Sequence, residues 1–240
     1  MAYIHTFLFG IYPYIALSVL ALGSIVRYDR EPYSWRSGSS QLLRRKQLMW
    51  GSVLFHLGVL MIFAGHFVGL LTPIWIFDTL GVSHEAKQIL AMGAGGVAGV
   101  MAIIGATLLV HRRLFDPRVR ASSSTSDTLI IILLWIQLFL GLSTIPLSMQ
   151  HLDGHEMVKF MNWAQGIFSF NTAASSYIAD VSIIFKLHIF LGLTIFLLFP
   201  FTRLVHMLSA PVRYIWRPGY QVVRKRNHSP IPGHARAQVE

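Results

Sequence analysis

Five long apolar stretches constrain this chain more than any other feature of its sequence. They cover about residues 6–26, 48–77, 89–110, 129–149 and 181–208. About 20 consecutive apolar residues are enough for a helix to cross the hydrocarbon core of a bilayer. Charged residues make up only 12% of the chain, about half the share found in soluble domains. We therefore predict an all-α, polytopic membrane protein with five transmembrane helices embedded in a lipid bilayer.

Two prolines and the connection between spans four and five predict departures from five straight helices joined by loops. The second stretch is longer than a perpendicular helix needs, so it should tilt or end near Thr72 and Pro73. Pro200 should kink the fifth span. The first stretch lacks the features of a cleaved leader, so we expect it to be retained. The connection between spans four and five should hold an interfacial helix over about 156–170, with apolar side chains facing lipid: Met157, Phe160, Met161, Trp163 and Phe168.

Lysine and arginine are unevenly distributed between the connections. Of 20 such residues, 17 lie at 27–46, at 112–120 or from Arg203 onward, and the others are Lys87, Lys159 and Lys186. The positive-inside rule then places the N-terminus outside and the C-terminus in the cytoplasm. The basic excess follows membrane topology, so we expect no nucleic-acid partner. We divide the chain into a transmembrane domain over 1–217 and a basic cytoplasmic tail over 218–240.

Histidine is the residue type that carries the functional prediction. The chain has no cysteine, which excludes disulfides and iron–sulfur clusters ligated within it, and it has 11 histidines. An ionisable group inside a membrane is costly and by default marks a functional site. Four histidines lie inside spans: His56 and His66 on the second, His188 and His206 on the fifth. The other seven lie at helix ends, in loops or in the tail, where a solvated imidazole is the simpler interpretation.

Depth in the membrane pairs these four histidines. The second span runs outward and the fifth inward, so His66 matches His188 near the outside, and His56 matches His206 near the inside. One imidazole from each helix can then ligate a haem iron from opposite faces, which predicts two haems. His56 and His66 are about 15 Å apart along an ideal helix, whereas His188 and His206 would be about 27 Å apart. The pairing therefore requires a bend or a tilt in the fifth span.

Small and basic residues near these histidines suggest further roles. Gly58, Gly65, Gly69 and Gly192 could make room for a macrocycle, with helix packing as the alternative. Lys87 could donate a hydrogen bond to a quinone oxygen, although a lysine that reaches to the interface explains its position equally well. Candidates for haem propionates or for partner docking on the inner side are Arg112, Arg113 and Arg203, although topology alone accounts for basic residues there.

The order and spacing of several motifs carry a family resemblance. They are IYPYI (11–15), YSWR (33–36), GHF (65–67), LTP (71–73), RRLF (112–115), PRVRA (117–121), WAQ (163–165), LFPF (198–201) and RLVH (203–206). Over nearly the whole chain, to about Arg224, the sequence resembles the gamma subunits of membrane-bound respiratory nitrate reductases, which are dihaem b cytochromes. No single motif is specific, but their order together is.

The resemblance implies a five-helix subunit of the bacterial cytoplasmic (inner) membrane. It implies an outer haem on His66 and His188, an inner haem on His56 and His206, and quinol oxidation near the outer haem with Lys87 and Gly65 in the pocket. The implied partners are an iron–sulfur beta subunit and a molybdenum-cofactor alpha subunit that reduces nitrate. No catalytic residue for nitrate is then expected in this chain.

Two other functions stay open at this point. One is a cytochrome b subunit of a different quinone-linked enzyme, of the hydrogenase or formate dehydrogenase type. The other is a haem-free transporter or proton channel in which buried histidines relay protons. The sequence does not distinguish menaquinol from ubiquinol as the electron donor.

Overall fold

The computed structural model describes residues 2–35, 40 and 42–209, and every regular element in these ranges is helical. Five helices there are long and apolar enough to cross a membrane. This confirms the predicted all-α fold with five candidate spans. The predicted domain boundary at 217 and the basic tail over 218–240 lie outside the described residues.

The first candidate span is longer than predicted and covers Ala2–Arg30. A proline interrupts its hydrogen bonding: Pro13 has no backbone N–H, so the Phe9 carbonyl lacks the donor that a regular helix supplies four residues later. The indole Nε1 of Trp163 donates to that carbonyl at 2.9 Å. The span comprises α1 (Ala2–Thr6), a π-helical turn η1 (Phe7–Ile11) and α2 (Tyr12–Arg30), followed by a 3-10 turn η2 (Pro32–Ser34).

The second span, α3 (Arg45–Leu71), ends beside Thr72 and Pro73, as the proline predicts. The predicted range of 48–77 is therefore too long, and residues beyond Pro73 form a separate short helix, α4 (Ile74–Thr79). Gln165 stabilises this helix end. Its Nε2 donates to the carbonyls of Leu70 and Thr72, both at 3.0 Å, which satisfies two acceptors that a helix C-terminus leaves open.

The third and fourth spans begin at well-formed caps. They are α5 (His84–Phe115) and α7 (Thr125–Ser148), with the short α6 (Pro117–Ala121) between them. The three helices start after Ser83, Asp116 and Ser124, whose side-chain oxygens accept backbone N–H bonds. The cap on α5 starts this helix more than a turn before the predicted 89–110. Lys87 is thereby part of the helix.

The connection between spans four and five contains α8 (His155–Phe168) and a 3-10 turn, η3 (Ala174–Ile178). The helix agrees with the predicted one, but the prediction that its apolar side chains face lipid is wrong for Met161 and Trp163. Both are buried. Trp163 packs in a cluster with Phe9 of η1 and Ile178 of η3, because these segments provide an apolar surface within the protein.

The fifth span does not continue to residue 208 as predicted. Its helix, α9 (Ile183–Leu198), ends just before Pro200, and the chain then forms two 3-10 turns, η4 (Phe199–Phe201) and η5 (Arg203–Met207). Thr202 between the turns is extended. Pro200 thus ends the helix where a kink was expected. The length of about 27 Å for an unbroken helix from His188 to His206 therefore does not apply.

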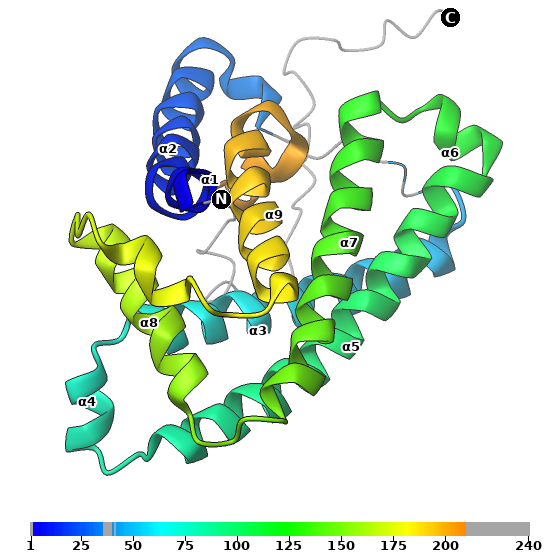
Figure 1. Ribbon diagram of the computed structural model, residues 1–240. Coiled ribbons are helices and arrows are strands. Elements are labelled where there is room, and N and C mark those ends of the chain that lie inside the picture. Colours follow the sequence, from blue (N-terminus) through cyan, green and yellow to red (C-terminus); the bar gives the residue numbers. More distant parts are fainter. Residues whose placement is uncertain (1, 36–39, 41, 210–240) are drawn as a thin grey trace, which may run out of the picture. The chain divides into compact units, whose positions relative to one another are not determined.

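The long helices pack in series, α3 on α5, α5 on α7, α7 on α9 and α9 on α2 (Figure 1). The first of these contacts is close, because a Cβ at Gly58 would lie 2.6 Å from the carbonyl oxygen of Ala98. By contrast, α3 and α9 face each other through large rings, such as Phe63 and Phe196 with centroids 6.2 Å apart. The four membrane histidines lie on these two elements and on the turn that follows α9.

Candidate functional site

The four membrane histidines form two pairs, each joining α3 to the segment that begins with α9. The ring centroids of His66 and His188 are 6.2 Å apart, and their planes are inclined by 43°. The centroids of His56 and His206 are also 6.2 Å apart, with an inclination of 71°. The structure brings together the same partners that the depth argument pairs.

This separation suits one metal ion between two imidazoles. A ligating nitrogen lies about 2 Å from its metal and about 1.1 Å from its own ring centroid, so two rings on opposite sides of the ion are about 6 Å apart. Two imidazoles are an incomplete ligand set on their own, and no cluster of three His, Asp or Glu side chains occurs within residues 2–35, 40 and 42–209. A planar macrocycle that supplies four nitrogens and leaves two axial positions fits this donor pair.

Hydrogen bonds orient three of the four rings. In each, Nδ1 lies near a backbone carbonyl about one turn earlier: Ser52 for His56 (2.8 Å), Ile62 for His66 (2.9 Å) and Arg203 for His206 (2.5 Å). A carbonyl only accepts, so Nδ1 must carry the hydrogen. In the neutral imidazole, the Nε2 atom is then unprotonated and able to ligate a metal.

His188 is oriented differently, by contact with α7. Its Nδ1 is buried and has no hydrogen-bond partner among the described residues. Its backbone carbonyl accepts from Nε2 of Gln137 at 3.1 Å. A Cβ at Gly141 would lie 3.0 Å from the Cε1 atom of the ring. The neighbouring helix therefore fixes this ring from the side.

The glycines near the histidines fall into two groups. A Cβ at Gly65 or Gly69 would meet no atom within 4 Å, which leaves room for a flat ring system beside His66. Gly58 and Gly192 instead follow the packing alternative. Gly58 packs against α5, and a Cβ at Gly192 would lie 3.1 Å from Nε2 of Gln137. Packing also explains Gly99 on α5, where a Cβ would lie 2.7 Å from Leu142.

Lys87 is buried, with 7% of its surface exposed, so it does not reach to the interface. Its Nζ lies 2.7 Å from the sulfur of Met161 on α8 and 3.7 Å from the ring centroid of Phe77 on α4. A thioether is a weak acceptor, and no carboxylate in the described ranges forms an ion pair with Lys87. The ammonium group can therefore still donate to a strong acceptor. It does not fill the space beside Gly65, because a Cβ there would meet nothing within 4 Å.

Arg112 fastens a connection to the end of α5. It is buried, its Nη1 donates to Oγ of Ser40 at 3.0 Å, and its Nη2 donates to the carbonyls of Ser40 and Leu43, both at 2.7 Å. These bonds hold the segment between α2 and α3. Of the three arginines predicted to bind haem propionates or a partner, Arg112 is the one whose donors bond to Ser40 and Leu43 of this connection.

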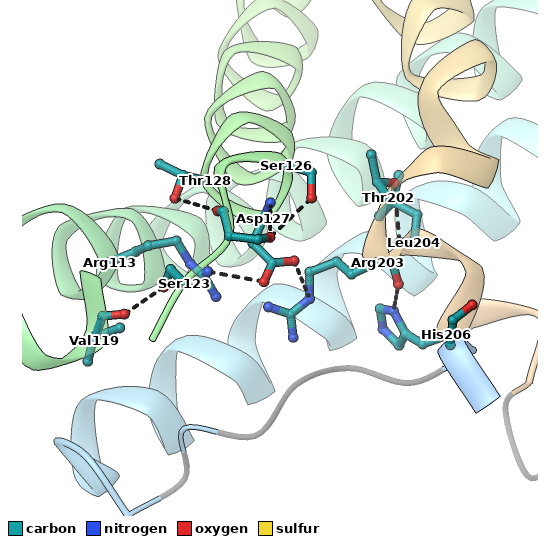
Figure 2. A network of polar contacts seen from close by, with 12 residues as sticks. Arg113, Val119, Ser123, Ser126, Asp127, Thr128, Thr202, Arg203, Leu204 and His206 are labelled. Carbon is teal, nitrogen blue, oxygen red and sulfur yellow. Dashed lines mark hydrogen bonds and ion pairs between the residues drawn. The ribbon is translucent and has the colours of Figure 1, made fainter. Parts of the chain in front are cut away.

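Arg113 and Arg203 share one carboxylate, as Figure 2 shows. One Nη1–Oδ2 contact joins Arg113 to Asp127 at 3.6 Å, and one Nε–Oδ1 contact joins Arg203 to the same Asp127 at 3.8 Å. Asp127 lies in the first turn of α7, and the His206 ring bonds the carbonyl of Arg203. The structure therefore brings two of the predicted basic residues to the turn that carries His206.

Arg27 of α2 supports the same region from the other side. Its Nη1 donates to the carbonyls of Pro200 at 2.7 Å and Thr202 at 2.8 Å. Its Nε donates to Oγ of Ser34 at 2.9 Å. The chain after α9 has left its helix, so these carbonyls need donors from elsewhere. Arg27 thus holds the chain just before the His206 turn.

A further ion pair stiffens this end of the molecule. The Asp116 carboxylate accepts backbone N–H bonds from Val119 at 3.2 Å and Arg118 at 3.0 Å, and it lies 2.7 Å from Nε of Arg44. The Val119 bond, with the other two contacts, holds the pKa of the Asp116 carboxyl below its ordinary value. Donors that favour the ionised form therefore surround this carboxylate.

Sequence reasoning missed three residues that support the histidines: Arg27, Asp127 and Gln137. Arg27 was counted only as a topological charge. Gln137 is the polar residue in the middle of a strongly apolar stretch, a signal that marks it for inspection. Asp127 is an acidic residue close in sequence to the basic inner connections, but nothing in the sequence indicates which arginines it meets.

Comparison with known proteins identifies the family of this chain. The family model described as Nitrate reductase gamma subunit matches residues 5–226. The Respiratory nitrate reductase 1 gamma chain of Escherichia coli K12 is 52% identical over 227 residues, covering 95% of this chain and 100% of the relative. The Respiratory nitrate reductase 2 gamma chain of the same organism is 50% identical over 224 residues, or 93% and 98%. The Nitrate reductase gamma chain of Bacillus subtilis 168 is 40% identical over 220 residues, or 92% and 98%.

Proposed function

This chain belongs to the nitrate reductase gamma subunit family, and from that premise we propose that it is the dihaem cytochrome b subunit of a nitrate reductase. It oxidises quinol near the outer face and passes electrons through two b haems to a cytoplasmic iron–sulfur subunit. The chain is thus one subunit of an oxidoreductase complex, and nitrate is reduced in another subunit.

The observation that carries the proposal is the pairing of the four histidines. Both pairs have a centroid separation of 6.2 Å, and three of the rings offer an unprotonated Nε2. Gly65 and Gly69 leave room beside His66. In the proposal, His66 and His188 hold the outer haem, and His56 and His206 hold the inner one. When bound, the haems supply one-electron chemistry at two depths of the membrane.

The quinol site is proposed beside the outer pair. Lys87 is buried and has a thioether and an aromatic ring as its nearest partners. A quinol oxygen would give its ammonium group a strong acceptor, and burial strengthens that bond because water does not compete. Gly65 precedes His66 and would line the pocket without obstructing it. Menaquinol and ubiquinol share the chemistry that Lys87 would recognise.

The inner end is proposed to face the cytoplasm and the electron acceptor. The positive-inside rule supports this orientation, with the N-terminus outside. The chain has no cysteine, so iron–sulfur clusters must be ligated by another subunit. The partners are accordingly an iron–sulfur beta subunit and a molybdenum-cofactor alpha subunit. Arg113 and Arg203 are candidates to pair with haem propionates at this end. The membrane is proposed to be the bacterial inner membrane.

Absorption spectra of single-ligand variants test the haem assignment. The purified wild-type protein should give a reduced-minus-oxidised b-type spectrum with two components. His66→Ala and His188→Ala should remove one component, and His56→Ala and His206→Ala should remove the other. His155→Ala, which changes an exposed histidine at the start of α8, should retain both. Two intact components in His66→Ala would make the pairing wrong.

The remaining parts of the proposal have their own readouts. Lys87→Ala should slow haem reduction by quinol while haem content stays normal, and unchanged kinetics would remove Lys87 from the site. Wild-type protein without Soret absorption would instead favour a proton-relaying transporter. Soluble subunits that co-purify with the chain would distinguish a nitrate reductase from a hydrogenase or formate dehydrogenase complex.

A further inference from the structure

We propose that Asp127 is a positioning residue for the inner haem. Its carboxylate holds Arg113 and Arg203 beside the turn that carries His206, and its charge sets the reduction equilibrium of the iron bound there (Figure 2). This inference rests on the proposed function, because it requires a haem on His56 and His206.

Asp127 joins three separate elements. Its Oδ2 lies 3.6 Å from Nη1 of Arg113, close to the C-terminus of α5, and its Oδ1 lies 3.8 Å from Nε of Arg203 in η5. Asp127 itself lies in the first turn of α7. Each carboxylate oxygen therefore serves a different arginine, so one side chain connects two helices to the turn.

The three charges are partly sheltered from water. Their side chains are 13% (Arg113), 22% (Asp127) and 25% (Arg203) exposed. Pairs of this kind are screened less than fully solvated surface pairs, and a change of one charge is felt over a longer distance. A removed or added charge here should therefore act on a neighbouring iron.

Arg203 connects this network to the His206 ring. The carbonyl of Arg203 accepts the hydrogen of His206 Nδ1 at 2.5 Å, while its side chain meets Asp127. Thr202 caps the same turn, with its Oγ1 accepting from the N–H of Leu204 at 3.3 Å. The side-chain contact with Asp127 thus restrains the backbone group that orients the ligand. The bond from Nδ1 to the carbonyl also influences how basic the ligating Nε2 is.

The charge balance gives the sign of the effect. Asp127 supplies a negative charge that offsets part of the positive charge of Arg113 and Arg203, and Arg112 adds to the positive charge that acts on Arg113. Without the carboxylate charge, more positive charge would remain, and it would favour the less positive, ferrous iron. The reduction equilibrium of the inner haem should therefore shift toward the reduced form when Asp127 is neutralised.

A simpler role for Asp127 is stabilisation of the N-terminus of α7. Its backbone N–H donates to Oγ of the cap Ser124 at 3.1 Å, and an acidic side chain in a first turn interacts favourably with the helix dipole. That role predicts a loss of stability in a neutral variant but no selective effect on one haem. The two roles therefore differ in a measurable way.

The test is a redox titration of the assembled complex, followed by absorption, in wild type and Asp127→Asn. The inner component is identified as the one that remains in His66→Ala. We expect its reduction equilibrium to shift about tenfold toward the ferrous form, equivalent to about 59 mV for a one-electron couple, while the outer component stays unchanged. Asp127→Glu should restore the wild-type value. Ser126→Ala, one residue away in the same turn, should leave both components unchanged.

A second variant keeps the inference testable if Asp127→Asn does not assemble. Arg113→Gln removes a positive charge and should shift the inner component in the opposite direction. The inference is wrong if Asp127→Asn lowers thermal stability with both haems unshifted, if both haems shift equally, or if Arg113→Gln leaves the inner component unchanged. Absence of haem from wild-type protein would contradict the proposed function itself.

Discussion

The outer and inner histidine pairs have the same ring separation but are supported in different ways. His66 and His188 both lie within regular helices, α3 and α9. His206 instead lies in a 3-10 turn beyond the end of α9, and the chain around it is held by Arg27 and by the arginines that meet Asp127. Regular helices carry His56, His66 and His188, whereas contacts between elements hold the irregular turn that carries His206.

This difference predicts which substitutions should disturb each haem site. The backbone of a residue within a continuous helix is held by the helix's own hydrogen bonds, so it tolerates the loss of a single side-chain contact better. A ring on an irregular turn depends on each group that satisfies the turn's carbonyls. Polar substitutions at the inner end should therefore affect the inner haem far more than the outer one.

The largest expected effect comes from Arg27→Ala. The change leaves the carbonyls of Pro200 and Thr202 without their charged donor, and each such bond contributes about 1.5–3 kcal/mol. We expect the free energy of unfolding to fall by about 3 kcal/mol and the inner haem component to decrease while the outer one persists. Thermal unfolding and absorption spectra of the purified protein measure both. Arg30→Ala, at the exposed end of α2, is the control, and an equal loss of both components would remove the contrast between the pairs.

A smaller effect on the opposite haem is expected for Gln137→Leu. Leucine fills a similar volume but cannot donate to the His188 carbonyl, which costs about 1 kcal/mol. The band position or potential of the outer component should change slightly, and the inner component should not. Ser143→Ala is a suitable control, because Ser143 donates to the Phe139 carbonyl of its own helix. A shift confined to the inner haem would contradict the role given to α7.

The smallest expected effect is a pH dependence that depends on Asp116. Because the pKa of its carboxyl is held below the ordinary 3.8 in the folded protein, Asp116 contributes stability that is fully present above that value. The contribution is lost as the pH falls through the lowered folded pKa. Between about pH 6 and pH 3, the free energy of unfolding should fall less steeply with decreasing pH in Asp116→Asn than in the wild-type protein. Asp29→Asn controls for the removal of a carboxylate at the same end, and an unchanged slope in Asp116→Asn would contradict the prediction.

The sequence predicted the spans better than it predicted what supports them. Apolar length is a local property, so five spans and the stop at Pro73 could be found directly. The pairing of histidines by depth also needed only chain direction. The sequence predicted a bend or a tilt that would bring His206 level with His56. The structure differs, because Pro200 ends the helix and the length of an unbroken helix from His188 to His206 does not apply. The partners of Asp127 and Arg27 come from other elements, and one sequence does not show which elements meet.

The buried position of α8 illustrates the same limit. Its helical period was visible, but the period alone does not state whether the apolar side meets lipid or protein. The carbonyl of Phe9, left without its helical donor by Pro13, receives the Trp163 indole. Hydropathy does not indicate this hydrogen bond, so the sequence alone predicted that Trp163 faces lipid.

That bond has a consequence for how the chain assembles. Pro13 removes one backbone donor from the first span, and the indole of Trp163 in α8 donates to the Phe9 carbonyl instead. Together with the bond from Tyr14 Oη to the Ile167 carbonyl at 3.0 Å, the Trp163 bond sets the rotation and height of the first span against α8. The proline in the first span thus creates an acceptor that helps to align this span with α8.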